Sequence, residues 1–206
     1  MQLRIWHLYP QDMNIYGDRG NVIALVQRAR WRGIEVELHA CDVGDRLDGE
    51  RCDLLFAGGG DELPGIGLLD LHTVAGRRRL IGDALVEAEV ELPDGSPGTL
   101  VGFENHSGQT FLGPGCRRLG RVVVGGGNNG QDGGEGAVHR WVHGTYLHGP
   151  VLPKNPWLTD RLIEQALRRR GWRGELPRLD DREEVAAHRT VAERTRRGGR
   201  RDSGVV

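Results

Sequence analysis

Between residues 3 and 57 the hydrophobic and polar positions follow the order expected of a parallel α/β sheet. The pattern predicts a strand, a helix and two further strands, at 3–9, 22–29, 34–38 and 53–57. Asn21 precedes the helical run and is its predicted N-cap. The last of these strands ends in three glycines, 58–60. A strand–helix–strand–strand order of this kind predicts the opening of an open parallel sheet.

Beyond residue 67 the pattern becomes mostly β. The expected strands are 68–74, 84–90, 99–104, 121–124 and 138–147, and a helix is expected at 157–170 with Pro156 in its first turn. The chain then becomes strongly charged, with eight arginines and five acidic residues between 178 and 201. We therefore expect one α/β domain over 1–176 and a disordered tail over 177–206.

Composition narrows the functional classes. The 206 residues carry a net charge of −1, which does not indicate general attraction to nucleic acids or to membranes. There is no signal-like start and no apolar run near the length of a membrane span, so a cytoplasmic protein is expected. Three cysteines at irregular spacing favour neither a disulfide framework nor a zinc site. His139, His143 and His148 do not predict a metal site, because on a strand the first two face away from the third. No cofactor is expected.

Three polar features are candidates for chemistry. His148 ends an apolar, β-rich run, where a catalytic base could stand, although a structural role remains open. The glycines at 58–60 could point backbone N–H groups at an oxyanion, or simply form a turn. The run 103–110 is a polar cluster after a strand and fits either a substrate pocket or a hairpin.

None of the cysteines has the setting of a nucleophile, which usually occupies a sharp turn between a strand and a helix. Cys41 leads into an acidic loop, and Cys52 precedes a strand. Cys116 lies beside two arginines, but no helix follows it.

Several motifs occur together in one order. They are Leu8-Tyr9-Pro10, Tyr16-Gly17-Asp18-Arg19-Gly20-Asn21, Phe103-Glu104-Asn105-His106-Ser107-Gly108, Gly127-Asn128-Asn129-Gly130, Gly144-Thr145-Tyr146-Leu147-His148-Gly149-Pro150 and Leu152-Pro153-Lys154-Asn155-Pro156. In these motifs the chain, over about residues 2–172, resembles the glutaminase subunits of lipid II isoglutaminyl synthase. Those subunits are class I glutamine amidotransferases of the cobyric-acid-synthase-like type.

The resemblance implies an open α/β amidotransferase sheet and glutamine hydrolysis. In this chemistry a cysteine attacks the side-chain amide, a histidine shuttles the proton, and a γ-glutamyl thioester forms. His148 matches the catalytic histidine, and Gly59 belongs to the loop near the oxyanion site. The implied partner, in a heterodimer, is a Mur-ligase-like, ATP-dependent synthetase subunit. That partner uses the ammonia to amidate D-glutamate of the lipid II stem peptide.

The chain departs from this family in three places. After Asp61 a block of roughly 30 or more residues, the size of a βαβ unit, is missing together with the Cys-Gly-Gly nucleophile elbow. Gln109 replaces the arginine that would hold the carboxylate of glutamine. No glutamate lies two residues after His148, so an acid that orients the ring must come from elsewhere.

The missing nucleophile predicts that glutamine is not hydrolysed, since losing such a residue costs on the order of 10⁶ in rate. An alternative is a non-catalytic scaffold that docks the ligase-like subunit, which then uses free ammonia. A third hypothesis makes the gap a deletion artefact or the mark of a decaying gene, which resequencing would reveal.

Overall fold

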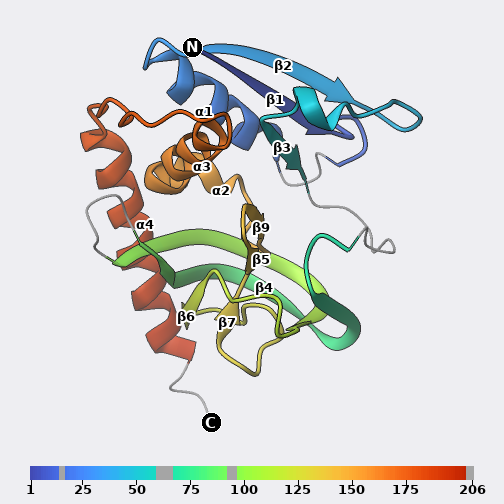
Figure 1. The fold of residues 1–206 in the computed structure, drawn as a ribbon. Helices are drawn as coiled ribbons and strands as arrows, with labels where there is room; N and C mark the ends of the chain where they lie inside the picture. The colour runs from blue at the N-terminus through green and yellow to red at the C-terminus, as the bar shows by residue number, and fades with distance from the viewer. Residues whose placement is uncertain (14–16, 59–66, 92–96, 203–206) are drawn as a thin grey trace. The chain divides into compact units, whose positions relative to one another are not determined.

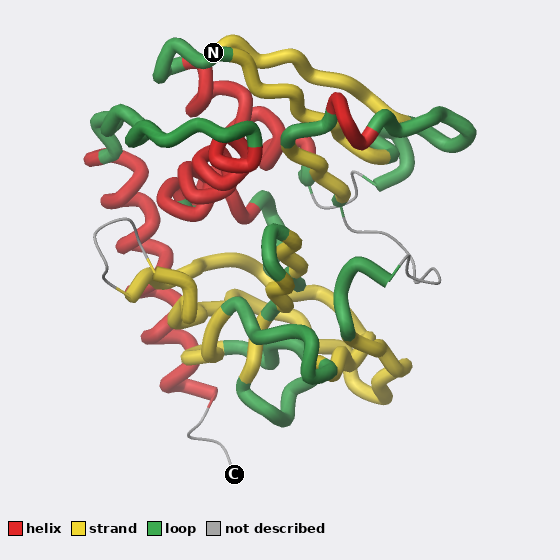
Figure 2. The backbone as a smooth tube through the Cα atoms, in the orientation of Figure 1, coloured by secondary structure: helices red, strands yellow, loops and turns green. Residues whose placement is uncertain are grey.

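The computed structural model describes residues 1–13, 17–58, 67–91 and 97–202. It divides into two compact units (Figures 1 and 2). The first comprises Met1–Glu62 and Gly149–Glu184, and the second comprises Leu63–His148 and Val185–Val206.

The first unit is built on a parallel sheet of three strands in the order β2-β1-β3. These strands are β1 (Gln2–Leu8), β2 (Glu35–Cys41) and β3 (Leu54–Ala57). Alternate residues of β1 are buried, Leu3 and Ile5 among them, as expected when one face of a sheet packs on a core. The open parallel sheet expected from the sequence is confirmed.

Helices complete this unit: α1 (Arg19–Arg30), α2 (Val151–Lys154) and α3 (Pro156–Arg169), with a short 3₁₀ turn, η1 (Gly49–Arg51), before β3. The buried residues of α1 recur at helical spacing, at Val22, Leu25, Val26 and Ala29. Asn21 lies inside α1 and not before it, and Asp18 precedes the helix without a side-chain cap. The predicted N-cap is therefore wrong.

A buried ion-pair cluster ties the end of this unit to α1. The guanidinium of Arg28 is 4% exposed and pairs with Asp160 and Asp181 at 2.7 Å each. Both aspartates hold the pKa of Arg28 above its usual range, although burial opposes this. Arg32 pairs with Asp160 as well, at 2.6 Å.

The second unit is an antiparallel sheet in the order β5-β4-β6-β7 with a separate hairpin, β8-β9. Its strands are β4 (Leu71–Glu91), β5 (Pro97–Leu112), β6 (Gly120–Val124), β7 (Gly134–Glu135), β8 (Ala137–His139) and β9 (Val142–Gly144). The long β4 and β5 form a twisted ribbon (Figure 1). The β-rich middle expected from the sequence is thus present.

The segment expected to be a disordered tail contains the helix α4 (Arg182–Asp202). Its inner side is a narrow stripe of small or polar residues, with Ala192 and Thr195 buried and His188 and Val191 half-buried. Ala192 packs against Leu85 and Val101 of the sheet. The charged composition hid this stripe, because only every third or fourth residue faces the core.

Candidate functional site

The structure joins two of the polar motifs through a backbone bridge. His148 N–H donates to the carbonyl of Phe103 at 2.7 Å, and Phe103 N–H donates back to His148 at 3.2 Å. Half-buried His148 is thereby fixed beside the start of the Glu104–His106 run. Two segments that the sequence analysis gave as separate candidates are therefore joined at the backbone, and the catalytic role of His148 stays a prediction.

Glu104 is buried and holds the glycine-rich loop that follows β6. One carboxylate oxygen accepts the N–H of Gly126 at 2.7 Å, and the other accepts the N–H of Gly127 at 3.0 Å. Further along, the Asn128 side chain exchanges two hydrogen bonds with the backbone of Gly136, at 2.8 and 2.9 Å. These contacts satisfy backbone groups that burial would otherwise leave unpaired.

A second buried carboxylate, Glu135, holds the segment that leads to His148. It accepts the Thr145 hydroxyl at 2.5 Å and the Tyr146 N–H at 3.0 Å. Complete burial raises the pKa of Glu135 to about 7, with nearby Glu104 adding to the rise, although these hydrogen bonds pull it down. Glu135 therefore changes charge close to neutral pH.

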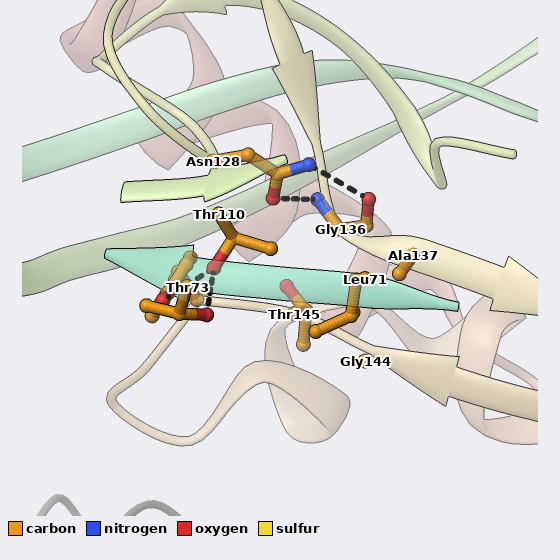
Figure 3. A pocket seen from close by; sticks show the side chains of 9 residues that line it. Leu71, Thr73, Thr110, Asn128, Gly136, Ala137, Gly144 and Thr145 are labelled. Atoms are coloured by element: carbon orange, nitrogen blue, oxygen red, sulfur yellow. Dashed lines mark hydrogen bonds between the residues drawn. The ribbon is translucent and has the colours of Figure 1, made fainter. Parts of the chain in front are cut away.

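Beside Glu135 lies a pocket of about 190 Å³, shown in Figure 3. Its lining residues are Leu71, Thr73, Thr110, Asn128, Gly136, Ala137, Gly144, Thr145 and Tyr146. The hydroxyl of Thr110 bonds to those of Thr73 at 2.7 Å and Tyr146 at 2.8 Å. Each of these two hydrogen bonds uses one hydroxyl hydrogen, and the three hydroxyl groups have three. Among the described residues, one O–H of this group is therefore left to donate to a ligand. The pocket therefore offers a mainly apolar wall and, from these three hydroxyls, one O–H donor.

His106 stacks face to face on Tyr146, with ring centroids 3.6 Å apart. Its Nδ1 lies 2.8 Å from the carbonyl oxygen of Gly108, which can only accept, so Nδ1 carries the hydrogen. The buried Nε2 has no hydrogen-bond partner among the described residues. This ring supports the tyrosine at the pocket wall.

Of the two predicted substrate-binding positions, the structure describes only Gln109. Gly59 lies outside the described residues. Gln109 pairs with Val74 across β4 and β5 and is half-buried. Since neighbouring residues of a strand face opposite sides, Gln109 points away from the side on which Thr110 lines the pocket.

The cysteines keep the settings expected for non-catalytic residues. Cys41 ends β2 and is buried, while burial raises the pKa of the Cys52 thiol, opposite to what activates a nucleophile. The Cys116 sulfur accepts the Asp70 N–H at 3.1 Å.

In the first unit the described part of one motif, residues 17–21, meets the motif at 149–156. The Asn21 side chain accepts the N–H of Leu152, at the start of α2, at 2.8 Å. A Cβ on Gly20 would come within 2.5 Å of the Pro150 ring, so this approach requires glycine. Both motifs therefore have a packing role here.

Sequence reasoning missed Glu135, Thr145 and Tyr146 as members of this cluster. The sequence carries no signal for Glu135, because it lies between two glycines at the end of the polar, glycine-rich run 125–136. Among the described residues no group of three histidine, cysteine or acidic side chains could hold a metal ion, and no helix is long and apolar enough to cross a membrane.

Comparison with known proteins adds relatives of the whole chain. The chain is 33% identical to the subunit GatD of lipid II isoglutaminyl synthase (glutamine-hydrolyzing) from Staphylococcus aureus, over 95% of this chain and 97% of the relative. It is 32% identical to the Streptococcus pneumoniae protein of that name, over 87% of this chain and 86% of the relative. The CobB/CobQ-like glutamine amidotransferase domain family matches residues 60–156.

A solved structure gives the same result at the level of the fold. A glutamine amidotransferase of Thermotoga maritima superposes with a TM-score of 0.51 at 13% identity, covering 97% of this chain and 93% of that one.

The alignments also reveal a length difference. The S. aureus alignment extends over 244 residues but includes only 95% of the 206 residues here, so about 50 aligned positions have no counterpart in this chain. The S. pneumoniae alignment, over 230 residues and 87% of the chain, gives a similar number. In both comparisons the total of unmatched positions is larger than a minimal βαβ unit.

Proposed function

Since the chain belongs to the glutamine amidotransferase family that includes the GatD subunits of lipid II isoglutaminyl synthase, we propose that it occupies the glutaminase-subunit position of such a synthase without hydrolysing glutamine. The relatives are named as glutamine-hydrolyzing subunits. This chain has three cysteines, and none has the setting of a nucleophile.

The observation that carries the proposal is the contrast between the histidine and its missing nucleophile. The His148 segment is fixed by the Phe103 bridge and by Glu135. The aligned positions without a counterpart are enough to contain a helix, a strand and a nucleophile elbow. Without the thiolate no γ-glutamyl thioester can form, so the histidine has no proton to shuttle.

The proposed partner is a Mur-ligase-like, ATP-dependent subunit that amidates D-glutamate of the lipid II stem peptide with free ammonia. Support comes from the relatives' names, which describe a subunit of a synthase. In this arrangement the chain is a docking subunit in the cytoplasm.

Glutamate release by the co-purified complex tests the missing activity. We expect the wild-type chain to release no more glutamate from glutamine than His148→Ala does, while ammonium chloride supports amidation in both. Release above the His148→Ala control would overturn the proposal. A chimera with the absent block from the S. aureus relative after Asp61 is a positive control for the assay, should it fold.

Complex formation is tested separately. The chain should co-purify with the ligase-like subunit at micromolar concentrations, and His148→Ala should not weaken the complex. No complex at those concentrations would refute the docking role.

A further inference from the structure

The N-terminal half of β4 carries three consecutive exposed arginines, Arg77, Arg78 and Arg79, on an arch. The register between β4 and β5 shifts between Ala75 and Leu80, so that 76–79 lie opposite the single residue Ser107. The extra residues cannot stay in the ladder and must bulge from it. The strand bends sharply in this teal part of Figure 1.

Glycine at the base makes the arch possible. A Cβ on Gly76 would stand 2.3 Å from the carbonyl oxygen of Ser107, closer than any side chain allows. The backbone therefore lies directly on β5 before it rises. The arch is therefore part of the β4–β5 ribbon, and its backbone holds the three arginines at a defined position on the surface.

The charge of the arch is not neutralised within its unit. Arg79 donates to the neutral amide oxygen of Asn105 at 2.6 Å. Among the described residues Arg77 and Arg78 have no hydrogen-bond or ion-pair partner. The neighbouring acids are engaged elsewhere, since Glu104 holds backbone N–H groups and Asp83 pairs with Arg194 at 3.2 Å.

Apolar side chains flank the arginines on both sides. Val74 is 44% exposed and Ile81 is 62% exposed, at either end of the arch. Uncompensated guanidinium groups beside exposed aliphatic side chains fit a surface of anionic headgroups above acyl chains.

We propose that the arch Gly76–Arg79, with Val74 and Ile81, docks this chain onto an anionic lipid surface. The biological role of this contact rests on the proposed function, in which the substrate of the synthase is attached to a lipid and therefore lies at a membrane. No described helix could cross that membrane.

A purely protective role for the arginines makes a different prediction. β6 pairs with β4 only from Leu85 onward, so the arch lies on a strand that has a free edge among the described residues. Charged residues at such edges prevent strand pairing between molecules. Their removal would then cause self-association and leave lipid binding unchanged.

Co-sedimentation of the full chain with vesicles tests the proposal. Wild type should bind vesicles of mixed phosphatidylglycerol and phosphatidylcholine, less at high salt, and should not bind pure phosphatidylcholine. The variant R77Q/R78Q/R79Q should bind the anionic vesicles about a hundredfold more weakly, as each arginine near the surface contributes roughly a factor of five. The matched control R189Q/R196Q/R197Q removes the same charge from exposed positions of α4 and should bind as wild type does.

Four outcomes would overturn the proposal. They are equal binding to both vesicle types, equal losses in both triple variants, competition by inorganic phosphate at constant ionic strength, and aggregation of the arch variant with unchanged lipid binding. Circular dichroism of each variant checks that it is folded. The assay needs neither the partner nor an activity, so its result is independent of the co-purification and glutamate tests above.

Discussion

Replacing Glu135 with glutamine tests whether a buried carboxyl group reduces the stability of the fold at neutral pH. Burial raises the pKa of Glu135 to about 7, from a reference value of 4.5. Between these two values the folded state binds more protons than the unfolded state, so the free energy of unfolding falls as the pH rises. At about 1.4 kcal/mol per pKa unit, the loss across this window is about 3 kcal/mol.

Urea unfolding of both proteins, at pH values from below 4.5 to above 7, measures this loss. Glutamine has nearly the same size, keeps an acceptor for Thr145 and Tyr146, and does not titrate. Groups that do not interact with Glu135 titrate equally in both proteins and cancel in the difference. We expect the variant to gain about 3 kcal/mol relative to wild type as the pH rises through the window. Two curves that stay parallel would refute the assignment of this pKa to Glu135.

Two further substitutions test packing. Arg28→Met should lower the free energy of unfolding by about 3 kcal/mol, because the partly buried Asp181 would lose its ion pair and Asp160 would keep only Arg32. Arg168→Met breaks an exposed pair and should cost less than about 1 kcal/mol, so equal costs in urea unfolding would contradict this reasoning. Gly127→Ala should lower the free energy of unfolding by about 1–3 kcal/mol more than Gly133→Ala does. Both glycines have a positive φ, but only the methyl group at position 127 would meet a backbone oxygen, at 2.3 Å. Equal melting temperatures of the two variants would disprove this.

The strands of the parallel sheet could be predicted because each is short, apolar and bounded by turn residues. β1 and β3 match the expected runs within a residue or two. The long β4–β5 ribbon was seen only in pieces, since the arch at 76–79 interrupts the alternation that identifies a strand. Helix α4 was missed because its buried stripe consists of alanine, threonine, valine and histidine among many charges.

The site could be predicted only where a motif itself forms a contact. The bridge between Phe103 and His148 joins two segments that the sequence singled out. The role of Glu135 depends on contacts ten and eleven residues away, to Thr145 and Tyr146, and its pKa depends on complete burial. Neither is visible before the chain is folded.

Most family-like motifs that this chain keeps make contacts that hold the fold. Glu104 binds the glycine loop, Asn128 binds Gly136, and Asn21 binds the start of α2. Each would leave buried backbone groups unpaired if replaced, whether or not the protein hydrolyses glutamine. Their presence therefore indicates descent and folding, and it says little about activity.

The departures, by contrast, fall on positions whose family role is chemical. The sequence contains no Cys-Gly-Gly run of the kind that the resemblance places at the nucleophile elbow, and Gln109 stands where the resemblance places a carboxylate-binding arginine. Gln109 sits in a regular β4–β5 pair, so the sheet itself does not require an arginine there. The proposed docking role predicts this pattern, in which contacts that hold the fold are kept and the departures fall on positions with a chemical family role. Glutamate release and complex formation, measured on the same preparation, would separate these two roles.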